Sequence, residues 1–142
     1  MIRARRVTAS VVVLGIAVAA LAACAPPAQT GLTPEQCERF TAAREHLDVY
    51  IADDWASFVD GQGVRVLSGV QRAVGRFEDV AEELGTPETE DAVDAVVRAG
   101  HDAATLAGDY IDDPPVPGDA DDLAEQEDVR SALDDALSDC AQ

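Results

Sequence analysis

The segment Val64–Leu84, which reads VRVLSGVQRAVGRFEDVAEEL, decides the fold class of this chain. Its apolar residues recur at every third or fourth position, the spacing that places side chains on one face of an α-helix. These residues are Val66, Leu67, Val70, Ala73, Val74, Phe77, Val80, Ala81 and Leu84. A helix with one apolar face needs another element to cover that face, so the segment predicts a packed helical domain.

Three more segments show helical spacing. The first runs from Thr33 to about Val59 and begins with a capping-box pattern, in which a threonine is followed by a proline and, two residues later, by a glutamine. The second begins at residues 86–88 with Thr-Pro-Glu and runs to about Ile111, with an inward face of small residues. The third covers roughly residues 120–140.

The linker before the last helix and the absence of strand patterns complete the fold prediction. Residues 112–118 read DDPPVPG, and the prolines in this run exclude a helix. No segment alternates between apolar and polar residues as a half-buried strand does. We therefore predict an all-α fold, an antiparallel up-down-up-down four-helix bundle at residues 33–142.

The N-terminus has the three parts of a secretory signal. Arginines among the first six residues precede the uncharged, apolar segment Val7–Ala23, which ends in small residues. The order Leu21-Ala22-Ala23-Cys24 resembles the lipobox of bacterial lipoproteins. The resemblance implies that residues 1–23 are a cleaved signal peptide, that Cys24 carries lipid, and that the protein is held on the outer face of the cell membrane. The alternatives are a secreted, unlipidated product and a permanent transmembrane anchor.

The remaining cysteines form an even pair. With Cys24 lipidated, two of the three cysteines are left in an exported, oxidising setting. The predicted topology brings the start of the first helix, with Cys37, to the same end as the close of the last helix, with Cys140. We expect a disulfide between them rather than two free thiols. Residues 24–32 then form a short tether between the lipid and the bundle.

Composition limits the partners. The formal net charge is −18, no lysine is present, and none of the 28 acidic residues lies in the predicted signal peptide. Such a charge repels nucleic acid, which we exclude as a partner. The acidic residues are most simply a solvated surface, although the charge also favours cations or a basic partner.

Two groups of charged residues are candidate sites. Arg44 and Asp48 interrupt the apolar stripe of the first helix, and the antiparallel register places them near Arg130 and Gln126 of the last helix. These four residues form either an internal ion network that fixes register or, less simply, a small anion site. On the outer face of Val64–Leu84 we expect a group of arginines. They form either a docking face for a partner or ion pairs with Asp79 and Glu83. These arginines are Arg65, Arg72 and Arg76.

The case for metal binding rests on His101 and on the aspartates of the linker. His101 is expected beside Glu90 and Asp94, and carboxylates crowd residues 112–122. Neither the spacing of an EF-hand nor a Glu-x-x-His pair is present, so we predict no metal site and keep cation binding as an alternative function.

No catalytic motif stands out. The sequence has neither a nucleophile elbow nor a phosphate-binding loop, and no cofactor motif is present. We predict a non-enzymatic interaction module of the cell envelope. A small helical enzyme that acts on an anionic metabolite is the least favoured alternative.

Overall fold

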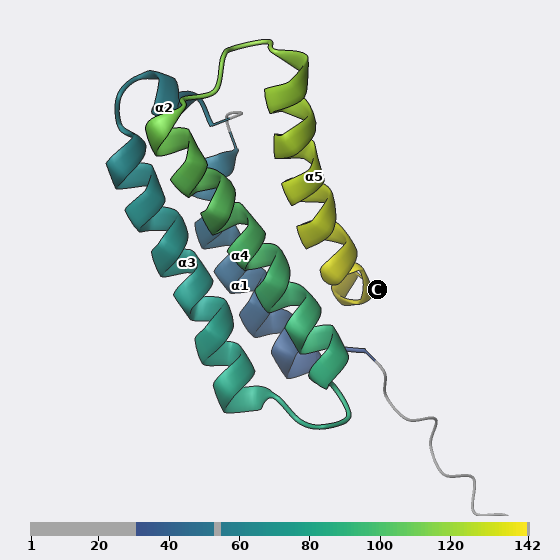
Figure 1. The fold of residues 1–142 in the computed structure, drawn as a ribbon. Helices are drawn as coiled ribbons and strands as arrows, with labels where there is room; N and C mark the ends of the chain where they lie inside the picture. Colours follow the sequence, from purple (N-terminus) through teal and green to yellow (C-terminus); the bar gives the residue numbers. More distant parts are fainter. Residues whose placement is uncertain (1–30, 53–54, 142) are drawn as a thin grey trace, which may run out of the picture.

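The computed structural model describes residues 31–52 and 55–141. Four long helices run alternately up and down, and a short helix follows the first of them (Figure 1). The elements are α1 (Pro34–Ile51), α2 (Ala56–Val59), α3 (Gly63–Leu84), α4 (Glu90–Asp112), α5 (Ala120–Ala136) and the 3-10 helix η1 (Ser138–Ala141). The described residues contain no strand. The predicted all-α, antiparallel bundle is confirmed. The predicted signal peptide and lipobox, and residues 24–30 of the predicted tether, lie outside the described residues.

The long helices pack side by side in the order α1, α3, α4 and α5, and η1 contacts both α1 and α5. All four long helices send fully buried side chains into one core. Those with no exposed surface are Phe40, Leu47, Val70, Phe77, Val96, Ala103, Ala107 and Leu133. No helix in the described ranges is both long enough and apolar enough to span a bilayer.

The small-residue face of α4 allows α3 to come close. A methyl group added at Gly100 would lie 2.5 Å from Cδ2 of Phe77, much less than a van der Waals contact. The Phe77 ring is fully buried and lies 6.1 Å from the ring of Phe40 on α1. The two helices therefore meet at a spacing that only a glycine at position 100 permits.

The predicted capping box is confirmed, and its glutamine does more than cap. The Thr33 N–H donates to Oε1 of Gln36 (2.8 Å), and the Gln36 N–H donates to Oγ1 of Thr33 (3.2 Å). The Gln36 Nε2 also donates to the Leu84 carbonyl (2.8 Å) and to Oγ1 of Thr89 (2.9 Å). One buried side chain thus joins the start of α1, the end of α3 and the start of α4.

The first predicted helix is shorter than expected, because it ends at Ile51 rather than near Val59. Trp55 has a left-handed backbone, with a φ of 60°, and precedes α2. This break turns Trp55 over the end of the bundle, where its ring lies 5.7 Å from Phe58 and 5.5 Å from Tyr110. A left-handed tryptophan is unfavourable by itself, so the aromatic packing must stabilise it.

Two other helix ends also differ from the prediction. α4 begins at Glu90 instead of at residues 86–88, because Thr89 is held in a turn by its contacts with Thr86 and Gln36. α5 ends at Ala136, and the chain then tightens into η1.

The disulfide closes the fold at the end where α1 begins. Cys37 and Cys140 are bonded, with 5.2 Å between their Cα atoms and a sequence separation of 103. This predicted pairing is confirmed. It attaches η1, and through it α5, to the first turns of α1.

Candidate functional site

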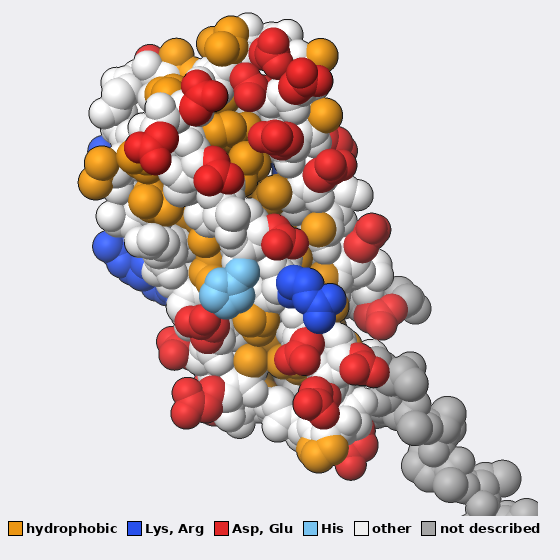
Figure 2. All heavy atoms as spheres, in the orientation of Figure 1, with side chains coloured by type: hydrophobic (Ala, Val, Ile, Leu, Met, Phe, Trp, Pro, Cys, Tyr) orange, Lys and Arg blue, Asp and Glu red, His pale blue; other side chains and the backbone are white. Residues whose placement is uncertain are grey.

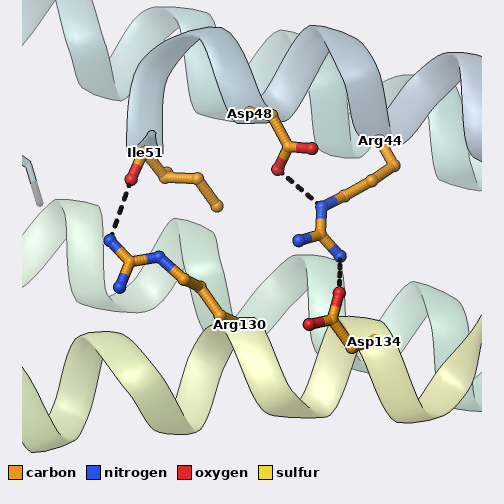
Figure 3. Close-up of polar contacts among 5 residues, drawn as sticks. All are labelled: Arg44, Asp48, Ile51, Arg130 and Asp134. Atoms are coloured by element: carbon orange, nitrogen blue, oxygen red, sulfur yellow. Dashed lines mark hydrogen bonds and ion pairs between the residues drawn. The ribbon is translucent and has the colours of Figure 1, made fainter. Parts of the chain in front are cut away.

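The seam between α1 and α5 is bridged by Arg44. Its Nε donates to Oδ1 of Asp48 (2.6 Å), and its Nη1 donates to Oδ1 of Asp134 (3.1 Å), as Figure 3 shows. The Arg44 side chain is only 15% exposed. Since two carboxylates already neutralise this guanidinium, the contact favours a role in fixing helix register over anion binding.

Arg130 also reaches α1 from α5, at a point other than Arg44, whereas Gln126 contacts α4 and so lies apart from the other predicted residues. The Arg130 Nη2 donates to the carbonyl of Ile51 (3.2 Å), an oxygen left without an intrahelical partner where α1 ends (Figure 3). A cation at this point is also favoured by the dipole of α1. Gln126 lies nearer the start of α5, where its Nε2 donates to the Tyr110 hydroxyl (3.2 Å).

The predicted arginine face of α3 is exposed. Arg65 contacts Oε1 of Gln62 at 3.4 Å, while Arg72 and Arg76 form no ion pair with any residue in the described ranges. Glu83, one of their expected partners, is bound instead by Arg39 of α1 at 2.7 Å. This hydrogen bond and the positive charge of Arg39 lower the pKa of the Glu83 carboxyl.

The predicted surroundings of His101 are wrong. Its Nε2 lies 3.0 Å from Oε1 of Glu78 on α3, and it does not pair with Glu90 or Asp94. Both partners are about half exposed. Residues 31–52 and 55–141 contain no group of three or more His, Cys, Asp or Glu side chains placed to hold a metal ion.

The linker aspartates shape the loop before α5. Asp119 is the N-cap, and its Oδ1 accepts hydrogen bonds from the N–H groups of Asp121 (3.0 Å) and Asp122 (3.3 Å). Oδ2 of Asp122 accepts from the Val116 N–H (2.7 Å), and the Val116 carbonyl accepts from the Asp119 N–H (3.0 Å). These bonds fix the proline-rich segment across the end of the bundle.

A cavity that the sequence analysis missed lies beside this loop. Its volume is about 250 Å³, and its walls come from α2, the loop and α5. The lining residues are Ala56, Val59, Pro115, Val116, Pro117, Gly118, Leu123 and Gln126. Three prolines between helices were interpreted only as a stiff linker. The sequence feature that could have indicated a site is Val116, an aliphatic residue between two prolines that does not pack into the core.

Behind the cavity wall stands a cluster of aromatic rings. Tyr110 packs edge-on against Trp55 (5.5 Å) and Phe58 (5.6 Å) and accepts the hydrogen bond of Gln126. Burial raises the pKa of the Tyr110 hydroxyl. Two buried polar atoms here, Oε1 of Gln126 and Nε1 of Trp55, have no hydrogen-bond partner in the described part of the chain.

The same end of the bundle exposes apolar surface and carboxylates together. Five large hydrophobic side chains are exposed among the described residues. Four of them are at this end, namely Val59 (46% exposed), Val64 (72%), Val116 (62%) and Leu123 (40%). Figure 2 shows hydrophobic and acidic side chains intermingled over the end that carries α2 and the loop before α5. Exposed apolar side chains are therefore concentrated at the end of the bundle that holds the cavity.

Comparisons with known proteins add no family to this description, since no family model, curated protein or solved structure matches the chain.

Proposed function

We propose that the protein is a membrane-anchored lipoprotein of the cell envelope and acts, without catalysis, as an interaction module. Support for the anchor comes from the lipobox-like residues Leu21–Cys24 after a basic and apolar N-terminus. Two or more acyl chains on one cysteine hold a protein stably on a bilayer.

The observation that carries the interaction role is the cavity at the end of the bundle opposite the tether. The tether would join the bundle at Thr33, where α1 begins, whereas Ala56 and Val59 of the cavity follow the end of α1. A helix of 18 residues is about 27 Å long. The apolar, acid-rimmed end therefore points away from the anchoring membrane, where a partner has access.

Three described side chains that could act as a nucleophile or a base make other contacts. The Ser68 hydroxyl donates to the Val64 carbonyl of its own helix, and the Ser138 hydroxyl donates to the Asp135 carbonyl of α5. His101 is on the surface, paired with a carboxylate of α3. None of these is arranged as a nucleophile with an adjacent base.

Photo-crosslinking in cells tests the proposal. A photoreactive residue is placed at Val116 on the cavity rim and, in a matched variant, at Arg72 on the arginine face. We expect one recurrent envelope partner at Val116 and none at Arg72. The reverse result would move the interaction to α3, and no capture at either site from correctly localised protein would contradict the proposal.

The anchor has a separate test. A Cys24→Ser variant should lose acyl label and leave the membrane fraction. Retention of this variant in the membrane would show that something other than lipid holds the protein there.

A further inference from the structure

We propose that the cavity beside Val116 binds a single aliphatic side chain of a partner protein, in a segment where lysine or arginine residues flank that side chain. This inference rests on the proposed function and names the chemistry of the partner. It is carried by the size of the cavity, the rigidity of its walls and the sign of the surrounding charge.

The volume selects a side chain over a larger ligand. Pockets for drug-sized molecules span about 300–1,000 Å³, whereas an apolar cavity of about 150 Å³ holds a benzene-sized group. At about 250 Å³ the cavity lies between these cases and fits one leucine-sized or isoleucine-sized group. The side chains that line it are aliphatic or proline rings except at Gly118 and Gln126. A buried aliphatic anchor surrounded by a polar rim is a common arrangement in protein interfaces.

The walls are formed before any partner arrives. Pro115 and Pro117 have fixed φ angles and no N–H group, so this wall is stiff and apolar. The hydrogen bonds of Asp122 and Asp119 to the backbone of Val116 hold the loop in place. On the other side, the left-handed backbone at Trp55 positions α2 and with it Ala56 and Val59. Strain of this type persists where the surroundings fix it, and it concentrates at functional sites.

The residues that line the cavity have acidic neighbours in the sequence, and Figure 2 shows acidic side chains at this end of the bundle. Asp60 follows Val59, Asp113 precedes the prolines, and Asp121 precedes Leu123 by two positions. Asp112 adds a fourth carboxylate, and none of these four forms an ion pair within the described residues. Basic side chains next to the aliphatic anchor would neutralise this rim. The same charge repels a second copy of the chain, which carries a formal net charge of −18.

Fluorescence anisotropy with three labelled heptapeptides tests the inference. The probe is Gly-Arg-Lys-Leu-Lys-Arg-Gly. One control peptide replaces its leucine with serine, and another replaces all its basic residues with glutamate. The protein is used as isolated, in nanodiscs of zwitterionic lipid if it is recovered from the membrane. We expect the serine peptide to bind at least about tenfold more weakly than the probe. The glutamate peptide should not bind, and added salt should weaken binding of the probe.

Matched variants locate the binding site. Val116→Ser and Leu123→Ser should each weaken probe binding severalfold, whereas Val49→Ser, at a residue 74% exposed on α1, should not. Replacing Asp112 and Asp113 with asparagine should weaken binding and its salt dependence. The control replaces Asp91 and Asp94, near the start of α4, and should change neither. Each variant is first shown to melt as the parent does.

Several results would overturn the inference. If the serine peptide binds as tightly as the probe, charge alone explains binding and the cavity does not hold the leucine. If the glutamate peptide binds as tightly as the probe, the acidic residues around the cavity do not contribute to binding. A dimer at micromolar concentration that Leu123→Ser dissociates would make a second copy the occupant. If no peptide binds but Val116 captures a partner in cells, the proposed function stands and this inference fails. Peptide binding without capture in cells would support the cavity chemistry and contradict the proposed function.

Discussion

Two glycines of the same helix should respond in opposite ways to alanine. Both Gly100 and Gly108 lie inside α4, so each gains up to about 1 kcal/mol of helix propensity when it becomes alanine. No atom lies within 4 Å of a methyl group built at Gly108, so Gly108→Ala should stabilise the protein by about 0.5–1 kcal/mol. At Gly100 the new methyl would meet Phe77 at 2.5 Å.

The response at Gly100 depends on whether Phe77 can move. This ring has no exposed surface and packs against Phe40, so it has no free direction in which to turn. Overpacking a core by one methyl group costs about 1–3 kcal/mol. After the gain in propensity, Gly100→Ala should lower the free energy of unfolding by about 1–2 kcal/mol.

Equilibrium unfolding in urea, followed by circular dichroism, measures both variants against the parent. We expect the two midpoints to lie on opposite sides of the parent midpoint with unchanged m-values. If Gly100→Ala stabilises the protein as much as Gly108→Ala does, then α3 and α4 are further apart than described and the reasoning is refuted.

Three further perturbations address other contacts. Gln36→Ala removes the side chain that joins α1, α3 and α4, and should lower the free energy of unfolding by about 2–4 kcal/mol in a urea titration. As a control, alanine in place of an exposed glutamine on α3 should have little effect in the same titration. In a Tyr50→Phe background, where Tyr110 is the only remaining tyrosine, ultraviolet absorbance should show that Tyr110 ionises above its ordinary pKa because of burial. Its contribution to stability should be complete below about pH 10 and lost as the pH rises through the raised pKa, and a normal titration would contradict the burial of this ring. Replacing Cys37 and Cys140 with serine removes a crosslink between residues separated by 103 positions. The free energy of unfolding in guanidinium chloride should fall by up to about 4.7 kcal/mol. An unchanged unfolding midpoint would show that the bond does not constrain the unfolded chain.

The features that follow from local spacing could be predicted from the sequence. The apolar face of Val64–Leu84 specifies a helix by periodicity alone, and the capping box at Thr33 marks a helix start by side-chain chemistry that involves only neighbours. The pairing of Cys37 with Cys140 required the topology, which follows once four helices alternate in direction. These predictions succeed because each depends on residues close in sequence or on a single global rule.

The features that depend on packing between distant segments could not be predicted. The apolar stripe of the first helix continues through Trp55 and Phe58, so periodicity cannot show that the helix stops at Ile51 and that the rings fold over Tyr110. The role of Arg130 depends on that break, because only an ended helix leaves the Ile51 carbonyl free. The cavity likewise needs α2 and the loop before α5 to meet, and no sequence pattern records that contact.

The disulfide has a mechanical consequence for a protein held at one end and gripped at the other. In the arrangement that we propose, tension between a lipid anchor and a partner at Val116 would enter the bundle at Cys37 and pass through the sulfur atoms into η1 and then α5. The covalent path from Cys140 back to Val116 is about 80 Å when fully stretched, whereas the path from Cys37 forward to Val116 is about 270 Å. The bridge therefore limits how far the protein can be extended under load, and the rest of α1, α2, α3 and the whole of α4 lie outside the shorter covalent path. Such a protein acts as a short spacer of nearly fixed reach rather than as an extensible tether.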